Sequence, residues 1–317
     1  MAQILCFGNI QCDILCRPVE FLPAPGEIRV IDNIEMVLSG NGGNVSAVLA
    51  RLGVAVELAG YSGADPIGEQ FRIMLQEPGV GIGKLLRHPS AGTGMSIITL
   101  TSGGERSIML VNGANELFEL DSVPDEWLAE TQLVAALSVF LLPQFTGVSV
   151  AKIFARAKAQ GARTLLNICW DTKNQGLESL KPALALTDYF VLNIDEARQL
   201  TGKHSPQEQL VCLEECTTGA IVLTLGADGC CWKEAGRDPE YIPALSVDAV
   251  DTTGAGDSFI AGFSAGLIKK HSLGECVRLG CITASFAVTG TGTYSRIPGF
   301  KEIDQLRQEV YLEPQNT

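Results

Sequence analysis

The chain has 317 residues, of which 46% are hydrophobic and 19% charged, a composition typical of a globular enzyme and unlike that of a disordered protein. Its formal net charge of −13, with no run of lysine or arginine, argues against nucleic acids and anionic membranes as partners, because affinity for them depends on basic side chains. A small phosphorylated ligand remains possible, since a helix N-terminus can bind phosphate whatever the net charge of the protein.

The N-terminal segment lacks the basic start of a signal peptide, and the longest apolar stretch, near residues 133–143, is too short to span a bilayer. The ten cysteines form no CxxC pair, and three histidines give no zinc-ligand spacing, so we expect reduced and mostly buried thiols. These features predict a cytoplasmic protein.

Short apolar runs alternate with longer amphipathic segments along most of the chain. The segments that carry this rhythm are residues 3–8, 45–52, 56–61, 70–75, 148–160, 164–168, 189–193 and 220–225. Strand followed by helix, repeatedly, predicts a largely parallel sheet covered by helices on both faces.

Two segments interrupt this rhythm and contain no convincing helix. Residues 14–38 hold three prolines before a β-rich run at 28–34, and residues 95–112 are typical of two strands around a glycine-containing turn. Together they predict a small sheet beside a single main domain over residues 1–312. The polar residues 313–317 are expected to form a frayed tail.

The N-terminal third contains two candidate polar elements. Asp13 follows the first predicted strand, and taken alone it is best interpreted as a surface turn acid. Residues 39–44, SGNGGN, form a glycine-rich turn that enters the predicted helix at 45–52. The turn does not have the GxGxxG spacing of a dinucleotide-binding fingerprint, and an ordinary tight turn stays open as an interpretation.

Two further turns follow predicted strands in the second half of the chain. Asn193 and Glu196 come directly after the strand at 189–192, and oxygen ligands of this kind suit Mg²⁺, although a glutamate that simply starts a helix is a common alternative. Residues 224–229, TLGADG, follow the next strand, and their Gly-x-x-Gly spacing on its own fits any β-turn.

The most informative segment is residues 251–259, DTTGAGDSF, which precede a helical pattern at 260–269. Gly254, Ala255 and Gly256 are small enough for a ligand to approach the backbone, and the free N–H groups of a first helical turn attract an anion. Asp257 would lie in that first turn, aimed at the anion, as a general base. The alternative is that Asp257 merely caps a buried helix.

Residues 251–259 resemble, without a gap, the signature of the ribokinase-like (pfkB) carbohydrate kinases. The resemblance implies a three-layer α/β/α sandwich with a mostly parallel central sheet and a small β-sheet lid, formed here by about 14–38 and 95–112. It implies that Gly254, Ala255 and Gly256 form the anion hole for the transferring phosphate, while Asp257 takes the proton of the acceptor hydroxyl. It also implies that Asp251 and the Thr253 carbonyl help to bind a monovalent cation such as K⁺, with a loop around 287–292 closing the site.

The same resemblance gives roles to the other motifs. It implies acceptor binding by Asp13, Gly40, Asn41 and Asn44. It implies ATP contacts from Asn193, Thr224, Gly226 and Gly229, and binding of Mg²⁺ through water by Glu196. Asn41 stands where many ribokinases have lysine, which leaves the identity of the acceptor open.

The resemblance therefore implies transfer of the ATP γ-phosphate to a hydroxyl of a small sugar, by a homodimer paired through its lid. A neutral sugar is favoured as the acceptor, because a phosphosugar would need more basic residues than Arg29 and Arg106 provide. An adenosine-like nucleoside is the nearest alternative, with the apolar residues Phe21, Ile28, Val30 and Met109 either stacking on the base or forming the core of the lid. A non-catalytic sugar- or nucleotide-binding sensor is an alternative of another class. A Rossmann-type oxidoreductase is disfavoured, because the early fingerprint is missing.

Overall fold

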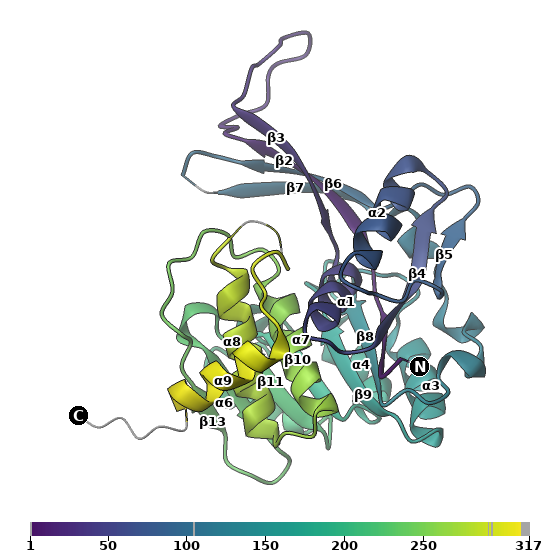
Figure 1. Cartoon of the computed structure of the whole chain (residues 1–317), viewed down its shortest axis with the longest axis vertical. Coiled ribbons are helices and arrows are strands. Elements are labelled where there is room, and N and C mark those ends of the chain that lie inside the picture. Colours follow the sequence, from purple (N-terminus) through teal and green to yellow (C-terminus); the bar gives the residue numbers. More distant parts are fainter. Residues whose placement is uncertain (1, 104, 291, 293, 312–317) are drawn as a thin grey trace.

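The computed structural model describes residues 2–103, 105–290, 292 and 294–311. Within them the chain forms a nine-stranded sheet in the order β13-β12-β11-β10-β9-β8-β1-β4-β5 (Figure 1). Its strands are β1 (Ile4–Phe7), β4 (Val56–Gly63), β5 (Leu85–His88), β8 (Leu133–Val139), β9 (Arg163–Ile168), β10 (Tyr189–Asn193), β11 (Ala220–Thr224), β12 (Cys230–Lys233) and β13 (Glu240–Ile242). All neighbours pair in parallel except the pairs made by β12, which are antiparallel.

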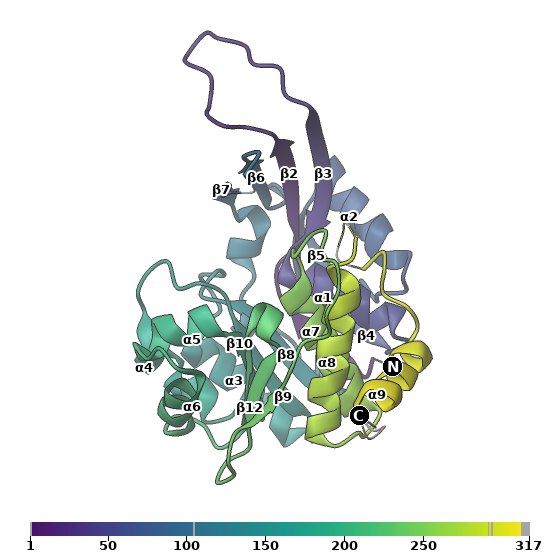
Figure 2. The ribbon, with the colours of Figure 1, turned by 90° about the vertical axis from the view of Figure 1, so that its left-hand side faces the viewer.

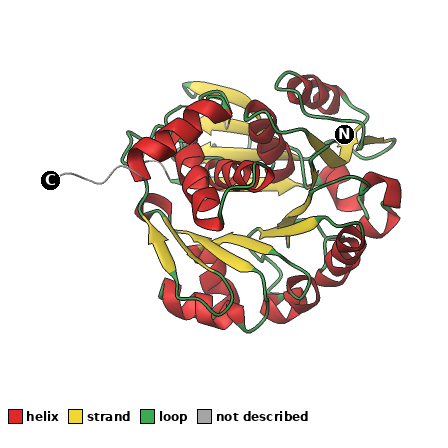
Figure 3. Cartoon of the chain, turned by 60° about the horizontal axis from the view of Figure 1, so that its bottom comes forward, coloured by secondary structure: helices red, strands yellow, loops and turns green. Residues whose placement is uncertain are grey.

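Helices cover both faces of this sheet, because its strands are apolar on both sides (Figure 3). In β1, Ile4 and Cys6 pack into one core cluster, while Leu5 and Phe7 pack into another. The first cluster is completed by α1 (Asn41–Arg51), α2 (Pro66–Gln76), α7 (Ala255–Ile268), α8 (Leu273–Ala287) and α9 (Phe300–Tyr311). The second is completed by α3 (Gly147–Ala159), α4 (Gly176–Leu184), α5 (Ile194–Thr201) and α6 (Pro206–Glu214). The expected three-layer sandwich is confirmed.

Short 3-10 turns complete the main body. They are η1 (Gly113–Leu117), η2 (Leu120–Ser122), η3 (Asp125–Trp127) and η4 (Gly226–Asp228). No helix in the part of the chain that the structure describes is both long enough and apolar enough to cross a bilayer. All ten cysteines fall within that part, and each is a free thiol.

A separate four-stranded sheet projects from the main body, in the order β3-β2-β6-β7 (Figures 1 and 2). It consists of β2 (Gln11–Arg17), β3 (Asn33–Ser39), β6 (Met95–Leu100) and β7 (Arg106–Val111), so the expected small sheet is confirmed. The buried side chain of Asn115 stabilises the start of β2, where the small sheet leaves the main body. It accepts a hydrogen bond from the backbone N–H of Ile10 and donates one to the Ile10 carbonyl.

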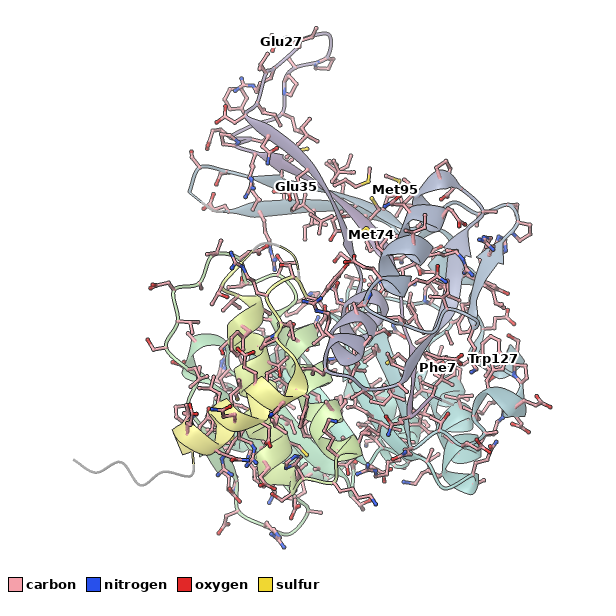
Figure 4. The ribbon with its side chains drawn as sticks, in the orientation of Figure 1. Phe7, Glu27, Glu35, Met74, Met95 and Trp127 are labelled. Carbon is pink, nitrogen blue, oxygen red and sulfur yellow. The ribbon has the colours of Figure 1, made fainter. Side chains whose placement is uncertain are left out.

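The loop between β2 and β3 differs from the sequence-based expectation. The strand expected at 28–34 begins only at Asn33, and the residues before it belong to the extended loop at the far end of the small sheet, where Glu27 lies (Figure 4). Phe21, Ile28 and Val30 are exposed by 61%, 96% and 92%, so the alternative that they form the core of the small sheet is wrong. The tail predicted at 313–317 lies outside the described residues.

Candidate active site

The glycine-rich turn after β3 brings the start of α1 against the end of β1. Gly40 has a φ of 95°, a left-handed conformation that favours glycine, and a Cβ atom there would lie 2.7 Å from the carbonyl oxygen of Asn9. A Cβ atom on Gly42 would lie 2.6 Å from the carbonyl carbon of Gly8. The glycines are therefore needed to let the helix approach the strand, which is more than an ordinary tight turn requires.

Polar side chains meet where β1, β8 and β9 end. The Oδ1 atom of Asn9 accepts hydrogen bonds from Ser138 Oγ (2.7 Å) and from the Asn41 backbone N–H (3.2 Å). The Asn41 side chain donates to Asn167 Oδ1 at 3.4 Å. Chain connections run in opposite directions from β1 and β8, so this is the edge of an open α/β sheet where ligands bind.

Asp257 lies in the first turn of α7, as predicted, and the structure brings it to the glycine-rich turn. Asn44 Nδ2 donates a 2.8 Å hydrogen bond to Asp257 Oδ2 across 213 residues of sequence. The N-cap of α7 is Gly254, with a φ of 76°, and no side chain caps the helix. The Ala255 N–H donates to the Thr252 carbonyl at 3.3 Å, whereas the N–H groups of Gly256 and Asp257 have no hydrogen-bond partner among the described residues and are available to an anion.

The electrostatic environment of Asp257 suits a base. Burial raises the pKa of its half-buried carboxyl to about 6, and the hydrogen bond from Asn44 opposes this rise. The thiol of Cys169 is nearby, and its pKa is raised first by burial and then by the charges of Glu196 and Asp257. Cys169, Glu196 and Asp257 therefore share one neighbourhood.

Asn193 and Glu196, both predicted site residues, form the capping box at the N-terminus of α5. The Asn193 side chain accepts hydrogen bonds from the backbone N–H groups of Asp195 and Glu196, and Glu196 Oε2 accepts one from the Asn193 N–H at 2.9 Å. Burial, with a smaller contribution from the charge of Asp257, raises the pKa of Glu196 to about 7. The helix-start alternative is therefore correct as local structure, and the second carboxylate oxygen of Glu196 accepts no hydrogen bond from the described residues.

The turn after β11 lies beside Asn193. Thr224 pairs with Asn193 at the carboxyl ends of the parallel strands β10 and β11. Gly226 and Gly229 have φ values of 63° and 101°, and a Cβ atom on Gly229 would lie 2.1 Å from the carbonyl oxygen of Ile242. These glycines shape a turn whose backbone faces the same edge of the sheet.

Asp251 and Thr253 lie just before α7. Asp251 Oδ1 accepts a 2.9 Å hydrogen bond from the Thr253 N–H, and the Asp251 N–H donates to the Val288 carbonyl. The structure thus places the segment at 251 beside the start of the predicted closing loop at 287–292, of which Thr291 lies outside the described residues.

Asp13 lies on β2 in the small sheet, and its surroundings explain why a surface turn acid is the wrong interpretation. The carboxylate is only 9% exposed, and Ser96 Oγ donates to Asp13 Oδ1 at 2.5 Å. Burial raises its pKa, opposed by hydrogen bonds from Ser96 and from Ser39, the residue before the glycine-rich turn.

The strand pairing of the small sheet decides which side chains share the face of Asp13. Asp13 pairs with Ser96, and Ser96 pairs with Leu110, so these residues lie on one face. By the same alternation Ile108 and Arg106 lie on this face too. Met109 pairs with Ile97 and lies on the opposite face, so the residue expected to stack on a nucleoside does not face Asp13.

Sequence reasoning missed Asn9, Ser96, Ser138 and Asn167. A signal existed for Asn9, a polar residue directly after a buried strand. Ser138 is fully buried and has a φ of 61°, a left-handed conformation rare in serine, which the sequence did not indicate. A cleft of about 640 Å³ was also missed; Arg106, Trp170, Asn193, Glu196 and Arg198 are among its lining residues.

Comparisons with known proteins agree with this geometry. Residues 1–299 match the family model described as pfkB family carbohydrate kinase. Ribokinase of Haemophilus influenzae is 30% identical over 302 residues, which cover 93% of this chain and 95% of the relative. The structure of Arabidopsis thaliana ribokinase complexed with ribose and ATP is similar with a TM-score of 0.85, at 24% identity over 97% of this chain and 99% of that one. A Methanocaldococcus jannaschii nucleoside kinase has a TM-score of 0.80, at 22% identity over 98% and 99%.

Proposed function

The chain belongs to the pfkB family of carbohydrate kinases and is an ATP-dependent phosphotransferase, and we propose that it transfers the ATP γ-phosphate to a hydroxyl of a small neutral sugar, with Asp257 as general base. The relatives named ribokinase support a sugar as the acceptor class.

The hydrogen bond between Asn44 and Asp257 carries this proposal. It joins the segment proposed to hold the acceptor to the segment proposed to hold the transferring phosphate. A base with a pKa of about 6 is largely deprotonated at neutral pH and is more basic than an ordinary aspartate. A hydroxyl held next to this carboxylate would lose its proton as the bond to phosphorus forms.

Acceptor binding is proposed for Asp13, Gly40, Asn41 and Asn44. Asp13 offers a carboxylate oxygen that accepts hydrogen bonds from hydroxyls, and Asn41 and Asn44 offer amides at the start of α1. Such contacts fix the orientation of the hydroxyl, and positioning accounts for a large share of catalysis in phosphoryl transfer.

Stabilisation of the transferring phosphate is proposed for the backbone of Gly254, Ala255 and Gly256. A Cβ atom on Gly256 would meet nothing within 4 Å, so the space in front of this turn is open to a ligand. The uncapped N–H groups point their partial positive charge at the phosphoryl oxygens, where negative charge develops.

Nucleotide and cation binding follow from the neighbouring residues. We assign ATP contacts to Asn193, Thr224, Gly226 and Gly229. The second carboxylate oxygen of Glu196 is a hard ligand that fits Mg²⁺ held through water, which would neutralise charge on the phosphates. Asp251, with one oxygen not engaged by the Thr253 N–H, and the Thr253 carbonyl fit a monovalent cation such as K⁺.

The small sheet is proposed to act as a lid and as a dimer interface. Its face opposite Asp13 exposes apolar side chains at Ile34 (66%), Met36 (57%), Ile97 (44%) and Met109 (54%). Pairing this outer face with a second copy would remove it from water. Met36→Glu should therefore convert a homodimer to a monomer in light scattering after gel filtration, and a wild-type monomer would contradict the proposal.

The proposed function is tested by ADP release from Mg-ATP across a panel of neutral sugars, sugar acids, phosphosugars and nucleosides, with Asp257→Asn as control. We expect release that depends on a neutral sugar and falls by about 10²–10⁴-fold in the variant. Wild-type turnover by Asp257→Asn would refute the role of the base. ATP binding without release for any acceptor would favour a sensor, and release with nucleosides alone would favour the nucleoside alternative.

A further inference from the structure

The carboxylate of Asp13 is already hydrogen-bonded to hydroxyls of the protein itself. Ser96 Oγ, on the neighbouring strand β6, donates to Asp13 Oδ1 at 2.5 Å. Ser39, at the end of β3, contributes a second hydrogen bond to the same carboxyl. Ser96 is only 3% exposed and lies directly opposite Asp13 in the pairing of β2 with β6. The fold therefore holds the Ser96 hydroxyl against the carboxylate before any acceptor binds.

This arrangement limits what Asp13 can accept from a sugar. A carboxylate binds two neighbouring hydroxyls best when each of its oxygens accepts a hydrogen bond from one of them. The Ser96 hydroxyl takes one of these two positions, at Asp13 Oδ1. Because each carboxylate oxygen has two lone pairs, Asp13 can still accept a hydrogen bond from one hydroxyl of the acceptor. It is poorly suited to a pair of adjacent hydroxyls.

The neighbours of Ser96 on this face of the small sheet offer no replacement for the lost position. Leu110 is the partner of Ser96 on β7, and Ile98 follows Ser96 two positions along β6, on the same face. Neither side chain can donate or accept a hydrogen bond. A second acceptor hydroxyl placed here would lose its hydrogen bonds to water and gain none from the protein. A CH₂ group in the same place would gain by leaving water.

We propose that the Ser96 hydroxyl occupies the place of an acceptor hydroxyl at Asp13 and thereby selects a deoxy sugar. Such an acceptor is neutral, presents one hydroxyl to Asp13 and has a CH₂ group where a second hydroxyl would meet Ser96. The inference rests on the proposed function, because it takes Asp13 as part of the acceptor site, and it narrows the class of acceptor. Ser96 is a positioning residue in this scheme, since it acts on the acceptor through Asp13.

The test compares D-ribose and D-glucose with their 2-deoxy and 3-deoxy analogues, all of which keep the primary hydroxyl. For the wild type, we expect the kcat/KM of ADP release from Mg-ATP to be about 10- to 100-fold higher for one deoxy analogue than for its parent sugar, the discrimination that an unpaired hydroxyl produces in an apolar site. Ser96→Ala frees Asp13 Oδ1. It should therefore raise kcat/KM for the parent sugar and reduce the preference to about threefold or less.

Two matched variants accompany Ser96→Ala. Ser107→Ala is the control, because Ser107 is an exposed serine on β7 that lies on the face opposite Asp13. It should leave the preference unchanged. Ser39→Ala removes the other donor to Asp13 and should weaken the preference in the same direction, so it tests the inference if Ser96→Ala folds poorly, which a Tm measurement detects. A purely structural role of either serine would change the turnover of parent and deoxy sugar equally.

Three results would overturn the inference. These are a wild type that prefers no deoxy analogue to its parent, an unchanged preference in both Ser96→Ala and Ser39→Ala, or an equal change in Ser107→Ala. Calorimetric titration with each sugar, without nucleotide, measures the same preference as a ratio of Kd values and needs no turnover. The two failures are therefore distinguishable: no ADP release with any sugar contradicts the proposed function, whereas sugar binding without the deoxy preference contradicts this inference alone.

Discussion

Replacing Asp257 by asparagine should stabilise the protein as well as inactivate it. Burial raises the pKa of this carboxyl from 3.8 to about 6, which is roughly two units, and each unit corresponds to about 1.4 kcal/mol. A carboxyl whose pKa is raised on folding binds more protons in the folded state between those two values. Its ionisation therefore lowers the free energy of unfolding as the pH rises from about 4 to about 6.

The variant removes this charge and keeps the contact with Asn44, because an asparagine oxygen also accepts a hydrogen bond from its side chain. Two pKa units correspond to about 3 kcal/mol, and partial exposure of the side chain lowers the expected gain at pH 7.5 to about 2 kcal/mol. For a chain of 317 residues this corresponds to a Tm increase of about 3 °C. At pH 4.5 the gain should fall to about a third, because Asp257 is then mostly protonated in the folded wild type.

The assay is calorimetric Tm measurement of both proteins at pH 4.5, 6 and 7.5 without nucleotide. Removing the charge of Asp257 also lowers the pKa of Glu196, but burial, the larger cause of the raised pKa of Glu196, is common to both proteins. Asp248→Asn is the control, because this aspartate is exposed and its replacement removes the same charge from a group in contact with water, so we expect little change in Tm. A gain for Asp257→Asn that is the same at all three pH values, or a loss at pH 7.5, would refute the link between burial and the basicity of Asp257.

Three other predictions concern the site and its support. The kcat/KM for the acceptor should rise with pH to a plateau above about 6, and Asn44→Ala should move this rise to higher pH, because its hydrogen bond lowers the pKa of Asp257; an unmoved profile would contradict the contact. Gly42→Ala should lower kcat/KM by about 10²-fold, since its Cβ would lie 2.6 Å from Gly8 and displace α1, whereas Gly299→Ala, with nothing within 4 Å of its Cβ, should have no effect. Arg307 is 3% exposed and forms ion pairs with two carboxylates. Arg307→Met should therefore lower the free energy of unfolding by about 2 kcal/mol, seen as a lower Tm with unchanged turnover at 25 °C. An unchanged Tm would show that the ion pairs do not contribute to stability.

Local pattern was sufficient for the elements of the sandwich and for most of its site segments. Strands such as β10 and β11 are short apolar runs, and a run of this kind is buried on both faces whichever neighbours it has. The prediction for the segment before β3 is wrong, because residues 28–32 have strand-forming side chains but pair with no strand among the residues that the structure describes. Their composition is correct for a strand, and only pairing decides whether one forms.

The sequence by itself determined that a turn of small residues leads into α7 with Asp257 in its first turn, since this local pattern favours a helix start without a side-chain cap wherever the helix lies. Only the tertiary structure decided that Asn44 touches Asp257, that Asn9 and Ser138 support Asn41, and that Arg106 and Glu196 line one cleft. These contacts join residues far apart in the chain, so they depend on the strand order and on the register of the lid. Local propensities act over a few residues and leave both undetermined.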